Sequence, residues 1–460
     1  MESTLRSRLD EFDQEQLLRF WDDLDEDARD RLRRQIDSID LAQLARLMEG
    51  TSDTPDWAEL AKKANPPKAI QLNGVENPFS QADALRRGEQ ALRDHQIGML
   101  LVAGGQGSRL NFAHAKGLFE IGPISKRSLL QVLIERQLAV ARRYATRIPL
   151  YMMTSPATHE ELITFLNDHD RFGLDEADLY VFCQGTMPAV DRKNWSILLE
   201  SKGEVALSPN GHGGMLEAFA ASDCLQDAHQ RGLSQLFYGQ IDNPLLNVCD
   251  PTLIGYHLLA GSELTTQVVK KRDPLEKVGN VVELNERTRI IEYSDLPDPI
   301  ARSRDEKGDI RLWAGNLGVH VFGLDFLTRM ADDTDALPFH QAKKKINYVG
   351  EDGNLVEPEA ENAIKFEQFI FDLLPAAKNA LVVEAAKEDA FAPVKNAEGA
   401  NSPETARQGM IRRDAELLRN SGAIVDDVAV EVNPLWALDS EEATRRIQPG
   451  LHVTQPTYFH

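Results

Sequence analysis

Cysteine is scarce in this sequence, since only Cys183, Cys224 and Cys249 occur among 460 residues. Their number is odd and they form no C-x-x-C pair, which argues against a disulfide framework and a structural zinc site. We expect reduced thiols, as in the cytoplasm. The sequence also lacks the charged-then-apolar layout of a signal peptide, and no apolar run approaches the roughly 18 residues that span a membrane. We therefore expect a cytoplasmic protein without a membrane partner.

An excess of basic residues is also missing. The chain has 51 lysine and arginine residues against 73 acidic ones, which gives a formal net charge of -22. Nucleic-acid binders neutralise phosphates with basic residues, so this balance argues against a nucleic-acid partner. A chain of this charge repels anions at long range, and any anion site must be built locally. With 42% hydrophobic residues, the chain has ample apolar material for a large core.

Three parts of the chain differ in pattern. Residues 1–95 have apolar positions at helical spacing, such as Leu32 and Ile36, and then a polar, proline-containing tether. Residues 96–384 alternate short apolar runs with helical segments, which is typical of a doubly wound α/β domain with a mainly parallel sheet. Residues 385–460 are a smaller C-terminal part. We predict a helical N-terminal region, a central domain and a small C-terminal domain with these boundaries.

The central part predicts strands and helices in alternation. The expected strands are the runs 97–103, 149–155, 179–185, 234–242 and 265–271, with a two-stranded insertion at 279–285 and 288–296. The expected helices are 128–144, 159–170, 213–230 and 251–261. Ligands of such sheets bind outside the carboxyl ends of the strands, so the polar residues that end these strands are candidate site residues.

A glycine-rich loop follows the first of these strands directly. It reads GGQGSRL from Gly104 to Leu110, and glycines there let backbone N–H groups approach a phosphate closely. The dinucleotide fingerprint G-x-G-x-x-G fails, because Leu110 stands where its third glycine belongs. The P-loop pattern fails because no Gly-Lys has the required spacing. An NAD-dependent oxidoreductase is therefore disfavoured, while Arg109 and Lys116 are close enough in sequence to converge on one polyphosphate.

A series of segments resembles one protein family in the same order. The stretch LLVAGGQGSRL...AKGLFEIG resembles the nucleotide loop of the sugar-nucleotide pyrophosphorylases, and more particularly of the eukaryotic-type UDP-N-acetylglucosamine pyrophosphorylases. The resemblance continues through QGTMPAV, SPNGHGGMLEA, IDNPLLNVCDP, IIEYSDL, AGNLGVHVF and FAPVKNAEG. It covers roughly Met99 to Arg407, and VAVEVNPLWAL further on resembles the family's C-terminal segment. Seven collinear segments are specific for the family and less specific for a particular sugar.

The resemblance implies a GT-A-like nucleotide-sugar transferase fold and an enzymatic activity. A sugar 1-phosphate would attack the α-phosphorus of UTP and release pyrophosphate, which leaves a UDP-sugar, with Mg²⁺ as the cofactor. The favoured substrate is N-acetylglucosamine 1-phosphate. Two alternatives stay open: the same reaction on another hexose 1-phosphate, giving UDP-glucose or UDP-galactose, and a non-catalytic nucleotide-binding homologue. The oligomeric state is also open.

The resemblance assigns residues to the phosphates. Arg109 would hold the leaving β,γ-phosphates, Lys116 would neutralise charge at the α-phosphate, and Lys395 would approach the sugar phosphate. Asp242 would be the main Mg²⁺ ligand, since a hard cation prefers carboxylate oxygen. Without the resemblance, the Asp-Asn-Pro sequence at this position would equally suit a turn. Amides of the loop would hold the nucleotide, namely those of Gly104, Gly105 and Gly107.

Five further residues would contact the base and the sugar. Gln184 would read the uracil edge with a donor and an acceptor, assisted by Gly211. Glu292 and Asn316 would hydrogen-bond the sugar hydroxyls. His212 stands where the family has an asparagine near the uridine and the N-acetyl region, and this change leaves the acceptor sugar open.

Other departures from the family pattern lie close to the nucleotide. Asn111 replaces the glycine after Arg-Leu, and Ala115 replaces the proline before the lysine. Asn210 replaces an aspartate and so removes a charge. The loop is therefore chemically altered although Lys116 is kept, and the sequence leaves open whether Asn111 and Ala115 lower activity.

Overall fold

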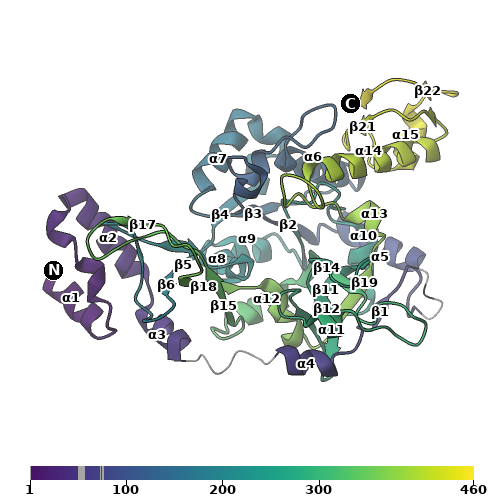
Figure 1. Ribbon diagram of the computed structural model, residues 1–460. Helices are drawn as coiled ribbons and strands as arrows, with labels where there is room; N and C mark the ends of the chain where they lie inside the picture. The colour runs from purple at the N-terminus through teal and green to yellow at the C-terminus, as the bar shows by residue number, and fades with distance from the viewer. Residues whose placement is uncertain (1, 50–56, 73, 75–76) are drawn as a thin grey trace. The chain divides into compact units, whose positions relative to one another are not determined.

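The computed structural model describes residues 2–49, 57–72, 74 and 77–460 (Figure 1). Contacts divide the chain into two units. The first, here called the N-terminal unit, comprises Met1–Asp56, Gln184–Met215 and Leu337–Ile370. The second, called the sheet unit, comprises Trp57–Cys183, Leu216–Ala336 and Phe371–His460. These units cut across the linear division at residues 95 and 384, which stays a prediction.

One large, mainly parallel sheet forms the centre of the sheet unit, as the alternating pattern predicts. Its order is β1 (Ala69–Ile70), β19 (Ala380–Glu384), β11 (Leu264–Lys270), β14 (Ala314–Gly323), β10 (Gln235–Gln240), β2 (Ile97–Val102), β3 (Leu150–Thr154) and β4 (Leu179–Cys183) (Figure 1). Along this order neighbouring strands run parallel except at β14, which is antiparallel to β11 and β10. The mixed α/β class with a mainly parallel sheet is thus confirmed.

Strand β2 has no polar side chain, and both of its faces are covered. In β2, Met99, Leu100 and Leu101 are all 0% exposed, although successive side chains point to opposite faces. Helices of the sheet unit contribute to the same core. They include α5 (Gln81–Arg93), α6 (Leu129–Arg143), α7 (His159–Asp168), α10 (Pro251–Leu259) and α14 (Pro403–Asn420).

Two expected elements differ from the structure. The helix expected over 213–230 is broken into α8 (Met215–Ala221) and α9 (Cys224–Gln230), because Asp223 has a left-handed φ of 61°. A short polar side chain such as aspartate tolerates this conformation better than an apolar one. The stretch expected to be a tether contributes β1 to the sheet edge, and its residues 50–56 lie outside the described residues.

The expected two-stranded insertion is confirmed. It is formed by β12 (Asn280–Leu284) and β13 (Arg287–Ile291), which pair in antiparallel register. A single pair, Asn280 with Gly315, joins β12 to β14. The insertion therefore lies beside the end of β14 that carries Asn316.

Helices and short strands form a separate core in the N-terminal unit. Helix α2 (Glu26–Ser38) begins after Asp25, whose carboxylate caps the helix by accepting the Ala28 N–H at 2.8 Å. Its residues Leu32 and Ile36, both 0% exposed, pack in one cluster with Phe366. Among the described residues, no helix has both the length and the apolar composition needed to cross a membrane.

Candidate active site

The glycine-rich loop after β2 closes on itself through backbone hydrogen bonds. The Lys116 N–H donates to Gly105 O at 3.0 Å, and the Gly107 N–H donates to His114 O at 2.9 Å. A Cβ on Gly107 would lie 2.7 Å from Phe112 O, so the loop's own packing requires glycine there. A Cβ on Gly105 would instead meet, among the described residues, only the Lys116 side chain, at 3.9 Å. The backbone of Gly105 is therefore open to a ligand.

The two replacements in this loop fit its geometry. Asn111 has a φ of 55°, in the left-handed region where a glycine is usual and asparagine is the best-tolerated alternative. Ala115 has a φ of -56°, which proline would share, but its N–H donates to Glu161 Oε2 at 2.7 Å. The same carboxylate contacts His114 Nδ1 at 2.5 Å. Glu161, from α7, thus holds the loop just before Lys116.

Lys116 has charged neighbours from its own loop and from two distant segments of the sequence. Lys116 is half-buried, and it lies within electrostatic range of Asp242, Lys395 and Arg109. Burial lowers the pKa of Lys116, Asp242 acts to raise it, and the cations Lys395 and Arg109 lower it, so the net shift is downward. Lys116 and its two cationic neighbours outnumber the one carboxylate among these residues, which makes the surroundings of Lys116 locally positive in an acidic chain.

Backbone contacts explain why Lys395 lies beside Asp242. The Val394 N–H donates to Asp242 O at 2.8 Å, just after the end of β10. Asn243, which is 4% exposed, adds two side-chain bonds to the same segment. Its Nδ2 donates to Ala390 O at 2.7 Å and its Oδ1 accepts the Ala392 N–H at 3.1 Å. The sequence analysis missed this positioning role of Asn243, although the Asp-Asn-Pro motif contains it.

Glu292 and Asn316 lie together at another part of the sheet unit. A Cβ on Gly279 would approach Glu292 Oε1 at 3.0 Å and the Asn316 side chain at 3.7 Å. Asn316 Oδ1 accepts the Gly318 N–H at 3.0 Å, which fixes its side chain near the start of β14. Glu292 and Asn316 therefore lie close to each other, and their contacts with a sugar stay a prediction.

A buried lysine that the sequence analysis missed supports this neighbourhood. Lys271 is 3% exposed and donates to Asn280 Oδ1, and Asn280 pairs in register with Ile291, the residue before Glu292. Burial lowers the pKa of Lys271 to about 8. The Val-Val-Lys-Lys sequence at the end of β11 placed this lysine at a strand end, and nothing in its sequence context distinguished it from a surface residue.

The remaining candidates belong to the N-terminal unit. Gln184 is 7% exposed, and Gly211 has a φ of 86° and no room for a Cβ, which would lie 2.4 Å from Gln368 O. The His212 ring stacks on Phe369, with centroids 5.4 Å apart, and its Nδ1 accepts the Ile370 N–H at 3.3 Å.

A single carboxylate is available for a metal in the charged cluster. Among the residues that the structure describes, no group of three or more His, Cys, Asp and Glu side chains could hold a metal ion. Asp242 alone still suits Mg²⁺, which keeps several waters and usually binds one or two carboxylates together with substrate phosphates. The residue types at this place would suit a polyphosphate together with its divalent cation, which stays a prediction.

Comparisons with known proteins agree with this chemistry. A family model described as UTP–glucose-1-phosphate uridylyltransferase matches residues 49–404. The UDP-N-acetylglucosamine pyrophosphorylase of Saccharomyces cerevisiae is 33% identical over 442 residues, which cover 91% of this chain and 92% of the relative. The human UDP-N-acetylhexosamine pyrophosphorylase-like protein 1 is 33% identical over 440 residues, 92% of this chain and 86% of the relative. In fold, the chain resembles the crystal structure of the Trypanosoma brucei uridine diphosphate N-acetylglucosamine pyrophosphorylase, with a TM-score of 0.82, 23% identity and 98% of each chain covered.

Proposed function

The chain belongs to the UTP–glucose-1-phosphate uridylyltransferase family, and on that premise we propose that it makes a UDP-sugar and pyrophosphate from UTP and a sugar 1-phosphate. The favoured sugar is N-acetylglucosamine, because the yeast relative, similar over 91% of this chain, is named for it. The single observation that carries the proposal is the meeting of Lys116, Asp242, Lys395 and Arg109 beside the open glycine loop.

The reaction requires one bond to form and one to break at the α-phosphorus of UTP. An oxygen of the sugar 1-phosphate forms the new P–O bond, and the bond to the β-phosphate breaks in line with it, so pyrophosphate leaves. No covalent enzyme intermediate and no proton transfer are needed, and the protein contributes positioning and charge stabilisation. The loop amides would orient the nucleotide, Lys116 would stabilise charge at the α-phosphate, and Arg109 would hold the leaving group. Lys395 would hold the sugar phosphate.

Asp242 would hold Mg²⁺ through its carboxylate. When bound, the ion would neutralise phosphate charge and help to orient the triphosphate. The neighbouring cations limit repulsion between the two anionic substrates, which would otherwise oppose their approach. In this proposal, a bound Mg²⁺ ion would make the acidic residue Asp242 part of the anion-binding site.

Sugar and base recognition involve the other candidates. Glu292 and Asn316 would form hydrogen bonds with the sugar hydroxyls. Gln184 and Gly211 would recognise the uracil. His212 places an imidazole ring where an asparagine amide would offer both a donor and an acceptor. This difference favours a second candidate function, in which the acceptor is another hexose 1-phosphate.

Turnover and binding should be measured separately to test the proposal. Protein incubated with UTP, N-acetylglucosamine 1-phosphate and Mg²⁺ should release pyrophosphate and form the UDP-sugar in equal amounts. The Asp242→Asn variant should lose turnover by on the order of 100-fold or more and still bind UTP by calorimetry without Mg²⁺. UTP binding without turnover by the unaltered protein would instead identify a non-catalytic homologue.

Two finer assignments accompany this proposal. A doubly wound, GT-A-like arrangement of the central sheet fits the strand order, and an experimental structure with UDP-sugar would test it. A cytoplasmic location fits the three cysteines, all of which are free thiols.

A further inference from the structure

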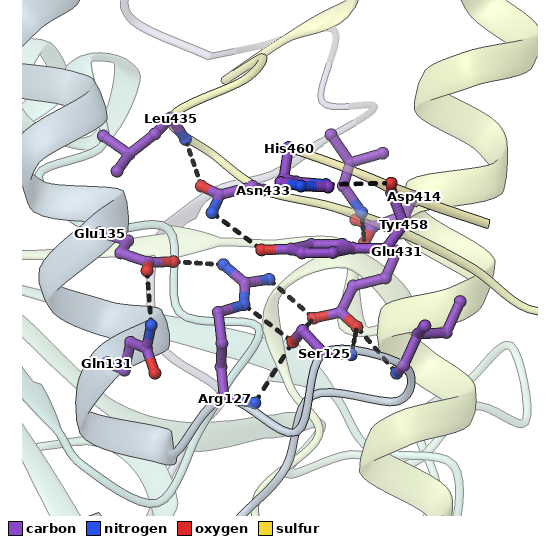
Figure 2. Close-up of polar contacts among 12 residues, drawn as sticks. Ser125, Arg127, Gln131, Glu135, Asp414, Glu431, Asn433, Leu435, Tyr458 and His460 are labelled. Atoms are coloured by element: carbon purple, nitrogen blue, oxygen red, sulfur yellow. Dashed lines mark hydrogen bonds and ion pairs between the residues drawn. The ribbon is translucent and has the colours of Figure 1, made fainter.

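A fully buried glutamate joins the C-terminal strands to the segment that follows the glycine loop. Glu431, in β21 (Val430–Val432), is 0% exposed. Its Oε2 accepts the Ile124 N–H at 2.8 Å and the Ser125 N–H at 2.7 Å, and its Oε1 accepts the Ser125 hydroxyl at 2.6 Å (Figure 2). Arg127 Nη2 donates to the same Oε1 at 2.7 Å. One carboxylate thus fixes residues 124–127 from more than 300 positions away in the sequence.

Arg127 extends this cluster into α6. Its guanidinium also pairs with Glu135 and lies over the Tyr458 ring, 5.3 Å from the centroid (Figure 2). Burial would raise the pKa of the Glu431 carboxyl, but the bonds from Ser125 and Arg127 outweigh it and hold the pKa below its usual range. Buried ion pairs of this kind are weak evidence for added stability, because desolvation offsets much of their attraction. Their specific geometry therefore suggests a different use.

The segment that Glu431 holds is rigidly connected to Lys116. The turn Lys116–Leu118 leads into a tight hairpin in which the Leu129 N–H donates to Phe119 O at 3.0 Å and the Ile121 N–H donates to Arg127 O at 2.9 Å. Residues 119–129 thus form one closed structure. A displacement at Arg127 would be transmitted to Lys116 through this hairpin.

The strand that carries Glu431 is in turn connected to Lys395. The Val432 N–H donates to Asp414 Oδ2 of α14 at 2.8 Å, and α14 begins directly after the loop in which the Lys395 N–H donates to Asn401 O at 2.7 Å. Arg407, also in α14, donates to Glu120 O of the hairpin at 2.8 Å. The hairpin beside Lys116 is therefore held from two places: by Glu431 of β21 and by Arg407 of α14.

We propose that Arg127 and Glu431 are positioning residues for nucleotidyl transfer, and that their buried pair sets the placement of Lys116 relative to Lys395. This inference rests on the proposed function, in which these lysines act on the two phosphates that react. Catalysis by positioning is sensitive to small shifts, and a displacement of about 1 Å can lower the rate about 100-fold. The pair therefore acts on turnover through the two lysines, without touching substrate.

A double-mutant cycle between Glu431 and Lys395 tests the inference. Glu431→Gln keeps one acceptor oxygen for the hairpin amides, replaces the other oxygen with an NH2 donor, and removes the charge that pairs with Arg127. We expect it to lower kcat about 10- to 100-fold while the dissociation constant of UTP changes little. Lys395→Ala alone should also lower kcat, and the double variant should lose much less than the product of the two losses, because a misplaced Lys395 has little left to contribute.

A matched pair elsewhere provides the control. Glu263 pairs with Arg329 at 2.7 Å at the opposite end of the sheet, near the start of β11, and Glu263→Gln should leave kcat unchanged. If Glu431→Gln does not fold, as judged by circular dichroism and thermal unfolding, Arg407→Met replaces it in the cycle, since Arg407 is partly exposed and its loss removes the second tie.

The possible outcomes distinguish a failure of the positioning inference from a failure of the proposed function. Losses from Glu431→Gln and Lys395→Ala that simply multiply would overturn the positioning inference and leave the proposed function intact. The same holds for Arg407→Met where that variant is used. A Lys395→Ala variant with unchanged kcat would contradict the role of Lys395 in the proposed function, and the inference would fail with it.

Discussion

Lys116 lies in surroundings that differ from those of an ordinary surface lysine. Its ammonium is half-buried beside Asp242, with two other cations nearby, and its pKa is lowered. A lysine side chain is positively charged at pH values below its pKa, and it loses this charge as the pH rises through the pKa. A role that needs the charge therefore disappears at lower pH than it would for a lysine of ordinary pKa.

Replacing Lys116 with arginine tests this dependence. The guanidinium stays charged through the alkaline range, so Lys116→Arg should shift the alkaline loss of kcat/KM for UTP to higher pH, even if the maximum rate falls. Lys116→Met should lower kcat about 100- to 1,000-fold. The measurement is the pH profile of kcat/KM, and an unchanged alkaline limb in Lys116→Arg would show that another group controls it.

His212 provides a prediction about substrate choice. Its Nδ1 accepts the Ile370 N–H, and its bulkier imidazole ring stands where an asparagine would present a carbonyl and an amide. His212→Asn should shift preference toward N-acetylated sugar 1-phosphates, measured as the ratio of kcat/KM for the N-acetylglucosamine and glucose substrates. An unchanged ratio would show that this position does not select the sugar.

Among individual residues, the sequence predicts those candidate site residues that lie within a short continuous motif. Lys116, Asp242 and Lys395 each lie in a motif that resembles the family, and the structure brings them within electrostatic range of one another. Asn243 and Glu161 could not be predicted as positioning residues, because their partners lie 147 and 46 positions away. Such contacts exist only after the chain has folded, and no local pattern encodes them.

Two glycines of the glycine-rich loop are expected to have different roles, one in packing and one in ligand binding. A methyl group on Gly107 would collide with the Phe112 backbone at 2.7 Å, whereas one on Gly105 would fit within the protein. Gly107→Ala should therefore lower the free energy of unfolding and impair activity together. Gly105→Ala should leave stability unchanged and raise the KM for UTP about 10-fold or more, because the methyl group occupies the approach of a phosphate.

Thermal unfolding and steady-state kinetics of both variants check this prediction. Equal behaviour of the two alanine variants would contradict it, since they would then share one role. A Gly105→Ala variant with normal KM would show that the open side of the loop does not face the nucleotide.

Among the elements, strand positions were predicted better than helix continuity. The apolar runs that became β2, β3 and β10 are buried on both faces, so their hydrophobic content marks them clearly. The helix expected over 213–230 breaks at Asp223, because an aspartate inside a helical pattern gives no signal of a left-handed turn. The short strand β1 went unpredicted because two residues carry no period.

For the whole molecule, the N-terminal helices have a structural role within their own unit. Leu32 is 0% exposed and shares a hydrophobic cluster with residues such as Val205 and Phe366, far along the chain. Leu32→Ala should lower the free energy of unfolding of this unit by about 2–5 kcal/mol. The exposed Leu355 of the same unit, 58% accessible, is the matched control, and Leu355→Ala should have little effect.

Hydrogen exchange can locate that loss. In Leu32→Ala the amides of 199–205 should exchange faster, because their strands pack on the same cluster, while amides of the large sheet should keep their protection. Uniform acceleration across both units would mean that they unfold together, and normal protection at 199–205 would show that the helices do not stabilise these strands.

The net charge of -22 is a property of the whole chain, and the proposed chemistry is local. Arg109, Lys395 and Asp242 all lie within electrostatic range of Lys116 in the sheet unit, so a polyphosphate bound there would meet positive charge despite the acidic background. Composition alone could exclude classes of partner but could not predict this cluster, since it depends on contacts among distant segments.

Pyrophosphate release from UTP and Mg²⁺ across a panel of sugar 1-phosphates tests the central claim most directly. The panel comprises N-acetylglucosamine, N-acetylgalactosamine, glucose and galactose 1-phosphates, with omission of sugar as the blank. The account predicts sugar-dependent release, with the highest kcat/KM for N-acetylglucosamine 1-phosphate, and its loss in Asp242→Asn. Absence of release with every sugar, from protein that binds UTP, would contradict it.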